Sequence, residues 1–554
     1  MKAELGALGP VATVQDDWWD VIVVGTGLGG ATIGHRLAQA GHRVLFLEKG
    51  KESFPPLAAP DDAEPEDPAE RLDRAHWPDR VSVTVDGRPT EMFAPLGCGA
   101  GGSSQLYAAT LERFERSDVE SVDGLPHPTG GWPIRWADLQ HYYGEAERLY
   151  RIVGTMDPLA QDDGPALPPP PPASPVDAEL MRNMAGIGLN PYRLHVGFAY
   201  LPGCGECGGK PCPMRCKSDS RLICVEPALA GGRATLRSEC EVLRIDADAV
   251  RAHGVTYRGA DGAERSVRAR MVVLAAGAYR SPALLLQSTS PAWPTGLTNR
   301  TDQVGRHLMF HVNEWFAVWP KRRASQAGPR KTIGLRDFYT RDGVRLGSIQ
   351  STGLSASGYH VYRFFVDMVE RSRLPKIRRL FPLLKIPAKI AAKLFGEATV
   401  FVMIVEDLGY PENRVVLDPR APGRIRVLYT VRDELRERSR IARKLIGKAF
   451  RGLRPFPFNF DLQLNYGHAC GTCRAGTDPA TSVVDGDCKA HDVDNLYIVD
   501  SAFMPTSGGT NLGLTIIANA LRVGDIISTR LRAAGVVAAE VQDAAMIAAT
   551  TLGV

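Results

Sequence analysis

The chain has 554 residues, of which 44% are hydrophobic and 23% charged, and its formal net charge is +4. This composition is that of a globular protein with sizeable cores, which excludes intrinsic disorder as the default. A net charge this small gives no reason to expect nucleic acid as a partner. The sequence contains no run of about 18 apolar residues, so no membrane-spanning helix is predicted.

The first 20 residues, MKAELGALGPVATVQDDWWD, contain neither the apolar core nor the cleavage site of a secretory signal. We therefore expect a cytoplasmic protein. Its ten cysteines are then interpreted first as thiols or ligands and only second as disulfides.

Near the N-terminus, the features of a dinucleotide-binding unit follow one another without interruption. The apolar run Val21–Val24 predicts a buried parallel strand, and the sequence GTGLGG at 25–30 leads into a helix over about Gly29–Ala40. A second apolar strand, Val44–Leu47, ends at Glu48, whose carboxylate can hydrogen-bond a ribose hydroxyl. A GxGxxG motif alone is a weak signal, but the whole unit predicts bound FAD or NAD, with a ligand-free turn as the alternative.

Each glycine of this turn has its own physical role. Gly25 permits the tight turn from strand to helix, Gly27 lets a pyrophosphate approach the backbone, and Gly30 lets helix and strand pack closely. The first N–H groups of the helix and the positive end of its dipole then face the phosphates.

The next 120 residues contain a second glycine cluster, GCGAGGSSQLY at 97–107. It predicts backbone pressed against a flat or phosphorylated group, with an ordinary surface loop as the alternative. Residues 51–90, rich in Pro, Asp and Glu, predict a surface excursion from the nucleotide unit. Apolar spacing predicts a helix over Trp132–Val153, and Pro168–Pro172 predicts a stiff polyproline II spacer.

The second half of the chain is predicted to be rich in strands. Residues 234–276 predict a β meander that returns to the nucleotide sheet, and alternating patterns over about 308–354 and 399–431 predict an antiparallel sheet. A charged helix over Arg432–Leu453 follows. Residues 495–534 then predict a strand, a proline-containing turn and a long helix.

Short motifs along nearly the whole chain resemble those of the glucose-methanol-choline (GMC) flavoprotein oxidoreductases. Their order and spacing make the resemblance specific although each is short. They are GTGLGG with Glu48, GAGGSSQLY at 99–107, AAGAYRSPALLLQS at 275–288, VGRHLMFH at 304–311, EDLGYPENRVVLD at 406–418, HACGTCRAG at 468–476 and NLYIVDSAFMPTSGGTNLGLTIIANALRVGD at 495–525.

The resemblance implies an α/β fold. A Rossmann-like FAD-binding domain is built from discontinuous segments, beside a substrate domain with a mostly antiparallel sheet and helices. The expected boundaries are 18–120, 201–305 with a Cys-rich insert at 204–224, and 456–535 for the FAD-binding domain, 121–200 for a cap segment, 306–455 for the substrate domain with a basic lid at 371–396, and 536–554 for a C-terminal tail.

The resemblance also implies two catalytic residues for alcohol oxidation. His468 matches the active-site histidine in H-x-x-G-T-x-R and has an intrinsic pKa suited to accept the hydroxyl proton. Asn511 matches the second catalytic position, which is usually His or Asn, and an amide can orient the substrate oxygen but cannot act as a base. A departure is Leu512, which stands where a proline often follows.

The remaining site residues are expected to contact FAD. Asp500 and Ser501 resemble the pair that meets the ribityl chain, and N–H groups near Thr515 should face the flavin C2 carbonyl. Because Gln105 follows the two serines where some relatives carry a linking histidine, non-covalent FAD is expected. The full set is Gly25, Gly27, Leu28, Gly29, Gly30, Glu48, Lys49, Gly101, Gly102, Ser103, Ser104, Tyr107 (where many members carry Asn), Val242, Ala276, Gly277, Asp500, Ser501, Asn511, Leu512 and Thr515.

A cysteine cluster lies outside these motifs, with Cys204, Cys207, Cys212 and Cys216 spaced C-x2-C-x4-C-x3-C. Thiolates this close can hold zinc or an iron–sulfur cluster, but the spacing matches no standard iron–sulfur run. Disulfides or packed thiols are therefore favoured, and no metal ligand is assigned firmly.

A basic amphipathic segment follows at residues 371–396, with eight Lys and Arg residues, no acid over 371–393, and apolar residues between them. Such a segment suits an anionic membrane surface, with an ordinary surface helix or a lid as the alternative. Its prolines divide it into short pieces.

The sequence thus predicts an FAD-dependent alcohol oxidoreductase with a small-molecule alcohol as substrate, in the cytoplasm or peripheral on the inner face of the membrane. The electron acceptor, O2 or a quinone or other carrier, is left open, and so is an apolar alcohol as substrate. A flavin-dependent lyase or decarboxylase on the same fold and a non-catalytic flavin-binding protein stay as alternatives. A nicotinamide enzyme is disfavoured because only one nucleotide-binding unit of this type is visible.

Overall fold

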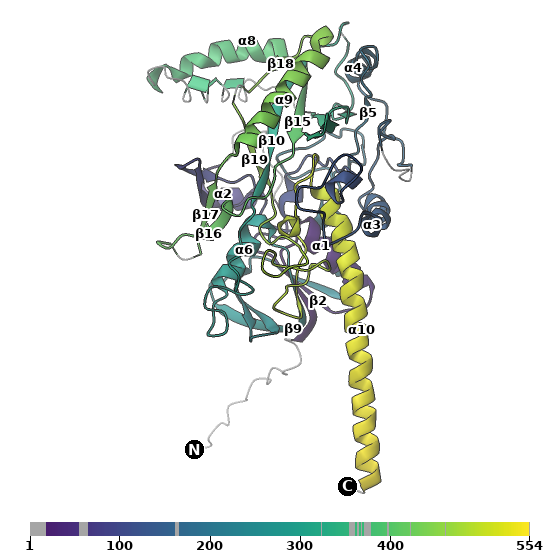
Figure 1. Cartoon of the computed structure of the whole chain (residues 1–554), viewed down its shortest axis with the longest axis vertical. Coiled ribbons are helices and arrows are strands. Elements are labelled where there is room, and N and C mark those ends of the chain that lie inside the picture. The colour runs from purple at the N-terminus through teal and green to yellow at the C-terminus, as the bar shows by residue number, and fades with distance from the viewer. Residues whose placement is uncertain are drawn as a thin grey trace, which may run out of the picture.

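The structure is a computed structural model. It describes residues 18–54, 65–160, 166–322, 324–353, 361–362, 365–366, 368–369, 378–395, 398–421, 423–459 and 461–552. Two seven-stranded sheets dominate it, one in the lower and one in the upper half of Figure 1.

The lower sheet is assembled from segments that lie far apart in the chain, in the order β6-β2-β1-β9-β8-β7, with β20 also paired to β9. Strands β6, β2, β1, β9 and β20 run parallel, whereas β7, β8 and β9 form an antiparallel meander. The strands are β1 (Trp18–Val24), β2 (Val44–Leu47), β6 (Ala234–Arg237), β7 (Glu241–Ala247), β8 (Ala252–Arg258), β9 (Glu264–Leu274) and β20 (Leu496–Ile498). The predicted meander and its return to the nucleotide sheet are confirmed.

The strands at the parallel centre of this sheet are apolar on both faces, as expected of strands that are buried on both sides. All four residues of β2 are buried, and β1 pairs with it from Val21 opposite Val44 to Val24 opposite Leu47. Helix α1 (Leu28–Gln39) follows β1 directly and packs against α10 (Gly513–Leu552), a helix from the other end of the chain.

The upper sheet is antiparallel throughout, in the order β18-β10-β15-β14-β11-β5, with β19 also paired to β10. Its core is apolar, and the rings of Phe316 and Phe401 stack with centroids 5.6 Å apart. The strands are β5 (Tyr192–Arg193), β10 (Met309–Val318), β11 (Ile333–Leu335), β14 (Ile349–Ser351), β15 (Thr399–Val405), β18 (Phe456–Pro457) and β19 (Leu464–Cys470). A two-stranded ribbon, β12 (Thr340–Arg341) and β13 (Val344–Arg345), lies outside it.

A smaller sheet corrects the prediction of a mere surface excursion over residues 51–90. There β3 (Arg80–Val85) and β4 (Arg88–Phe93) form a hairpin, and β3 runs parallel to β17 (Ile425–Tyr429), which pairs with β16 (Arg414–Leu417). Composition hid the hairpin, because only alternate residues of β3, Val81 and Val83, are fully buried.

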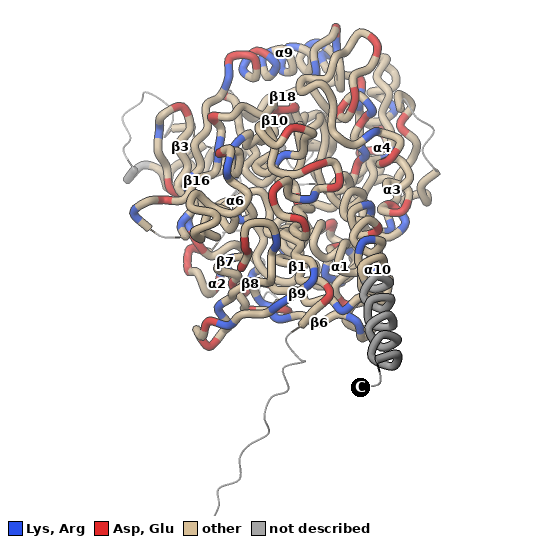
Figure 2. Tube along the Cα trace, turned by 60° about the horizontal axis from the view of Figure 1, so that its bottom comes forward, with Lys and Arg blue, Asp and Glu red and all other residues tan. Residues whose placement is uncertain are grey.

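The helices predicted over residues 132–153 and 432–453 are found in place, and the structure adds helices that the sequence did not predict. Helix α3 (Trp136–Leu149) occupies the first predicted helical stretch, and α9 (Asp433–Ala449) occupies the charged one, which carries both acidic and basic residues (Figure 2). The others are α2 (Pro68–Asp73), α4 (Pro175–Ala185), α5 (Glu226–Ala230), α6 (Gly277–Gln287) and α8 (Lys385–Phe395).

Helix α10 (Gly513–Leu552) is longer than predicted, because it continues through residues that the sequence left as a tail. Among the described residues, none of the helices has the length and apolarity needed to cross a bilayer. An α/β architecture with a discontinuous Rossmann-like sheet and a mostly antiparallel second sheet is thus confirmed.

Candidate active site

In the turn between β1 and α1, some glycines are packed tightly against protein backbone and one faces empty space. Gly25 has φ of +92°, and a Cβ on Gly30 would lie 2.1 Å from the carbonyl oxygen of Gly25, so no side chain fits there. A Cβ on Gly27 would meet no atom within 4 Å. The turn therefore presents bare backbone to empty space at Gly27, which fits an approaching pyrophosphate.

The second glycine cluster lies directly against the first. Gly102 has φ of +51°, and a Cβ there would lie 2.9 Å from the Cα of Gly27. The N–H of Gly101 donates to Thr26 Oγ1 at 3.2 Å, and the Ser104 hydroxyl donates to the Gly101 carbonyl at 2.6 Å. Tertiary packing thus brings two glycine-rich loops together to form one cradle.

Glu48 lies at the end of β2, where the sequence placed a ribose ligand, and it is buried. Its carboxylate accepts hydrogen bonds from the N–H and the hydroxyl of Thr26 at 3.1 and 2.7 Å, and from the N–H groups of Gly50 and Gly99 at 3.1 and 3.0 Å. Glu48 therefore ties both glycine clusters to β2, and its contact with a ribose stays a prediction.

Asp500 connects the strand β20 to the turn after β9. Its carboxylate accepts from the N–H of Gly277 at 2.9 Å, from the Ser281 hydroxyl at 2.5 Å and from the N–H of Ala502 at 2.8 Å. Burial raises the pKa of this carboxyl group above its usual value. The Ser501 hydroxyl donates to the Ala469 carbonyl at 2.8 Å, which connects this turn to the residue after His468.

His468 lies on β19 at an irregularity of the ladder with β10. Met309 pairs with Cys470 and His311 with Asn465, so β19 has extra residues between the two pairs. Such a bulge re-aims side chains, and here the His468 ring meets the ring of His311 edge-on, with the two Nδ1 atoms 2.8 Å apart.

Both imidazoles are held in the neutral form. Burial, with smaller contributions from the neighbouring His311 and Lys331, lowers the pKa of His468 to about 3. Burial also lowers the pKa of His311 to about 4, against the opposing effect of the backbone carbonyls of Gly508 and Ser507. A neutral histidine carries a free lone pair, which is the form that accepts a proton.

Asn511 lies just before α10, and its side-chain oxygen is buried without a hydrogen-bond partner among the described residues. An unpaired buried amide oxygen is costly, so this atom is suited to a ligand. Next to it, Leu512 is buried in the apolar core, and the Thr515 hydroxyl lies 2.8 Å from the Tyr143 hydroxyl.

Other predicted cofactor residues are placed by protein contacts. Lys49 pairs with Asp79 and Glu241, and the Tyr107 hydroxyl donates to the Ser218 carbonyl at 2.5 Å. The rest lie in the elements around the cradle: Leu28 and Gly29 at the start of α1, Ser103 with its hydroxyl accepting from the Gly97 N–H, Val242 buried in β7, and Ala276 and Gly277 at the start of α6.

The residue that the sequence did not single out is His311. Its only signal was its position at the end of VGRHLMFH, a motif whose other residues suggested no chemistry. His311 and His468 are 157 positions apart in the sequence, so no local pattern could reveal their contact.

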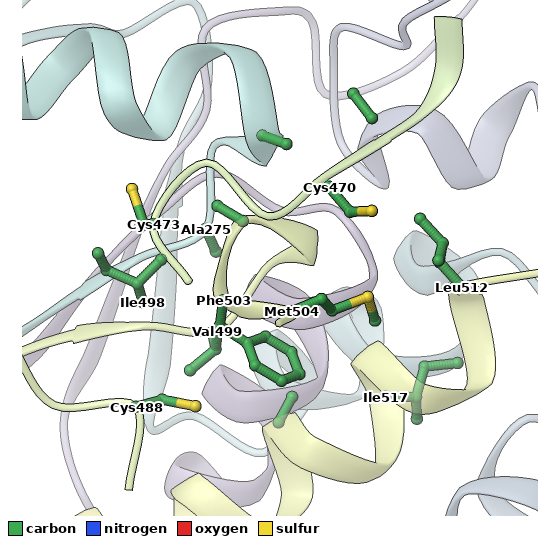
Figure 3. Close-up of a cluster of buried hydrophobic side chains, with 14 of the residues drawn as sticks. Ala275, Cys470, Cys473, Cys488, Ile498, Val499, Phe503, Met504, Leu512 and Ile517 are labelled. Carbon is green, nitrogen blue, oxygen red and sulfur yellow. The ribbon is translucent and has the colours of Figure 1, made fainter. Parts of the chain in front are cut away.

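The four cysteines of the insert do gather. The sulfur of Cys216 lies 3.2 Å from that of Cys204 and 3.4 Å from that of Cys212, and all ten cysteines of the chain are free. Among the described residues, no group of three or more His, Cys, Asp or Glu side chains could hold a metal ion. Zinc or an iron–sulfur cluster therefore finds no support here. Cys470 and Cys473 lie in the buried apolar cluster of Figure 3.

The predicted basic segment lies partly outside the described residues, which omit 371–377 and 396. The remainder forms a short 3-10 turn over Arg378–Leu384 and then helix α8. Pro387 lies within the first turn of α8, where a proline is tolerated.

Comparison with known proteins decides the family. The N-terminal GMC oxidoreductase model matches residues 19–313, and the C-terminal GMC oxidoreductase model matches residues 412–520. The chain belongs to the GMC oxidoreductase family. The resemblance drawn from the motifs is confirmed, and the protein is an FAD-dependent oxidoreductase of the alcohol-oxidising GMC type.

Relatives within the GMC family include both oxidases and dehydrogenases. The chain is 30% identical to the 6'''-hydroxyparomomycin C oxidase of Streptomyces lividus, over 94% of this chain and 93% of that one. It is 29% identical to the 2-methyl-1,2-propanediol dehydrogenase of Mycolicibacterium austroafricanum, over 94% and 96%. The fold is also that of formate oxidase from Aspergillus oryzae, with a TM-score of 0.63, 16% identity and coverage of 93% and 98%.

Proposed function

We propose that this GMC oxidoreductase oxidises a CH–OH group to a carbonyl, with His468 accepting the hydroxyl proton at Nε2 and Asn511 orienting the substrate oxygen. The observation that carries the proposal is the neutral His468 imidazole hydrogen-bonded through Nδ1, which leaves Nε2 as the free nitrogen. The Asn511 amide, whose oxygen has no partner among the described residues, is available to a ligand, and its NH2 group can donate to the substrate oxygen while the hydroxyl hydrogen goes to His468.

The reaction balances with two acceptors. The alcohol loses its O–H proton to His468 and its carbon-bound hydrogen with two electrons, and a C=O double bond forms. FAD, when bound, accepts that hydride. The residues around the two glycine clusters fit non-covalent FAD: the N–H groups at the start of α1, the bare backbone of Gly27 and Gly102, and the turn at Asp500.

The relatives differ by name in the electron acceptor that completes turnover. They include a paromamine 6'-oxidase from Streptomyces fradiae and the diol dehydrogenase. Their named substrates are polar, whereas the apolar residues of α8 favour a hydrophobic alcohol. A panel should therefore include sugars, aminoglycosides, diols and long-chain alcohols. Oxygen uptake with an active alcohol separates an oxidase from an enzyme that needs a quinone or another carrier.

The test is anaerobic mixing of the holoenzyme with this panel. We expect the flavin absorbance to bleach with at least one alcohol, and His468→Ala to slow bleaching by roughly a thousandfold or more while FAD stays bound. His195, a histidine bonded to the Thr155 carbonyl, supplies the control variant His195→Ala, which should bleach normally. Bound FAD that no alcohol bleaches would instead favour the lyase or the non-catalytic protein.

We also propose that α8 is a surface that contacts anionic lipid. The support is an exposed apolar stripe: among the described residues, Ile386 and Ile390 of α8 and Leu383 of the turn before it are 59 to 63% exposed, whereas Ala388 on the opposite face of α8 is buried. Lys385, Lys389 and Lys393 are exposed beside this stripe, and residues 378–395 contain no acid. Helix α8 lies at the upper edge of the molecule in Figure 1.

A second copy of the chain fits this surface less well. Three aliphatic side chains offer far less area than the roughly 800 Å² per partner of a stable interface. A symmetric contact would also bring lysines against lysines, whereas phosphatidylserine supplies the opposite charge.

Flotation with vesicles of phosphatidylserine and phosphatidylcholine tests this surface. Each lysine contributes about 1 kcal/mol, so K385E/K389E/K393E should lower binding by roughly a hundredfold or more. The matched control K444E/K448E/R451E makes the same charge change on and after α9 and should bind normally. Equal binding by all three proteins, or a concentration-dependent dimer that the α8 variant abolishes, would overturn the proposal.

A further inference from the structure

His311 is a fully buried histidine on β10 whose hydrogen-bond partners determine its tautomer. Its Nε2 lies 2.9 Å from the Gly508 carbonyl oxygen and 3.2 Å from that of Ser507. Carbonyl oxygens only accept hydrogen bonds, so Nε2 must carry the hydrogen. In the neutral ring Nδ1 is then a bare acceptor, and the partner 2.8 Å away is Nδ1 of His468.

The turn that supplies these carbonyls is held from several sides. The Ser507 hydroxyl accepts from the N–H of Asp407 and donates to the Asp407 carbonyl, both at 2.9 Å. Beyond it, the Gly509 N–H donates to the Tyr339 hydroxyl at 3.0 Å, and the Gly509 carbonyl accepts from the Ser348 N–H at 2.7 Å. Backbone fixed this firmly gives His311 little freedom to flip its ring.

We propose that His311 is a positioning residue that holds His468 in the Nδ1–H tautomer, so that Nε2 is the atom that takes the substrate proton. This inference rests on the proposed function of His468. The direction of these hydrogen bonds follows from the two carbonyls. Because they place the hydrogen of His311 on Nε2, its Nδ1 accepts from Nδ1–H of His468. His468 then has its lone pair on Nε2. The Nε2–H tautomer usually favoured by free histidine would leave no proton between the two Nδ1 atoms and no base at Nε2.

The arrangement also affects the protonated state. When Nε2 takes a proton, His468 becomes a cation that still donates from Nδ1 to a neutral acceptor. A charge-assisted hydrogen bond of this kind is stronger than the neutral one, so the contact tightens as the proton arrives. The other charged groups that influence the pair are Lys331, near His468, and Glu406, near His311.

Two substitutions distinguish the role of His311 as hydrogen-bond acceptor for His468 from its role as donor to the Gly508 carbonyl. His311→Asn can place an amide oxygen near the position of Nδ1 and keep an acceptor for His468. His311→Gln instead can keep a donor to the Gly508 carbonyl but removes that acceptor. A residue that merely filled space would tolerate both or neither.

The experiment measures alcohol-dependent flavin reduction by the holoenzyme in H2O and D2O, together with FAD content and melting temperature. We expect His311→Gln to reduce the rate by roughly ten- to a hundredfold and to increase the solvent isotope effect, because proton transfer becomes slower. His311→Asn should recover most of the rate, with KM for the alcohol little changed. Equal rates for wild type and His311→Gln, or equal losses in both variants with FAD bound, would overturn the inference.

A measurement on the wild type covers the case in which the variants do not fold. In 15N-histidine-labelled holoenzyme, the signals of position 468 are assigned by their loss in His468→Gln. We expect the hydrogen on Nδ1, and a hydrogen on Nε2 would contradict the inference. A His468→Ala enzyme that still reduces its flavin would instead refute the proposed function, so the two failures are distinguishable.

Discussion

The nucleotide turn and the histidine pair represent two different ways of building a site. The turn is contiguous, and backbone sterics define it: Gly25 and Gly30 leave no room for a Cβ. The pair joins residues 157 positions apart, and hydrogen bonds define it: two carbonyls, two imidazoles and a ladder irregularity. Substitutions in the nucleotide turn should therefore impair folding, whereas substitutions in the histidine pair should impair catalysis.

The largest effect is expected in the turn, where two glycines separate folding from binding. In Gly30→Ala the new Cβ would overlap the Gly25 carbonyl, which should lower the free energy of unfolding by about 3 kcal/mol or more. In Gly27→Ala the Cβ enters empty space at φ of −63°, so the apoprotein should melt normally. FAD affinity of that variant should nevertheless fall roughly tenfold or more, because the methyl group would enter the space in which we expect the pyrophosphate to lie.

Calorimetry of the apoproteins and FAD titration check this pair of variants. If Gly27→Ala melted as low as Gly30→Ala, or bound FAD as wild type does, the division of roles within the turn would be wrong.

A smaller effect is expected from pH, and it belongs to the histidine pair. The pKa of His311 is lowered to about 4 in the folded protein, whereas an unfolded histidine titrates near 6.5. Below pH 6.5 the unfolded chain therefore binds a proton that the folded chain does not, and stability falls as pH decreases toward 4. For one group the slope approaches about 1.4 kcal/mol per pH unit.

Buried carboxyl groups oppose this trend, since burial raises the pKa of Asp407 to about 7 and that of Glu115 to about 7. The prediction is therefore checked by measuring the free energy of unfolding in urea for wild type and His311→Gln at pH 4.5, 5.5 and 7.5 and comparing the two proteins at each pH. The wild type should lose relative stability as pH falls, and a pH-independent difference would contradict it.

The smallest effect is expected where α1 meets α10. Arg36 donates to both carboxylate oxygens of Asp525, at 2.6 and 2.8 Å, but both side chains are about one-third exposed. Solvent screens such pairs, so Asp525→Asn should lower the free energy of unfolding by less than about 1 kcal/mol and leave FAD content unchanged. Loss of FAD in this variant would mean that the helix contact, and not sterics, positions the turn.

The sequence was most informative where structure is local. Strand, glycines, helix, strand and acid in 31 consecutive residues sufficed for β1, α1, β2 and Glu48, since apolar periodicity and glycine sterics act over a few residues. The hairpin of β3 and β4 was missed, because its outer face is polar and its parallel partner β17 lies about 340 residues away.

By itself the sequence predicted the family, the order of many strands and helices, and His468 and Asn511 as candidate catalytic residues. Only the tertiary structure showed which residues surround them. It brings the two glycine clusters into contact at Gly27 and Gly102. It also surrounds the Glu48 carboxylate with hydrogen-bond donors from the protein and places the His468 ring against that of His311. The physical reason is that steric effects and hydrophobic periodicity depend on residues close together in the sequence. The tautomer of a histidine depends instead on hydrogen-bond partners that only the folded backbone brings within reach.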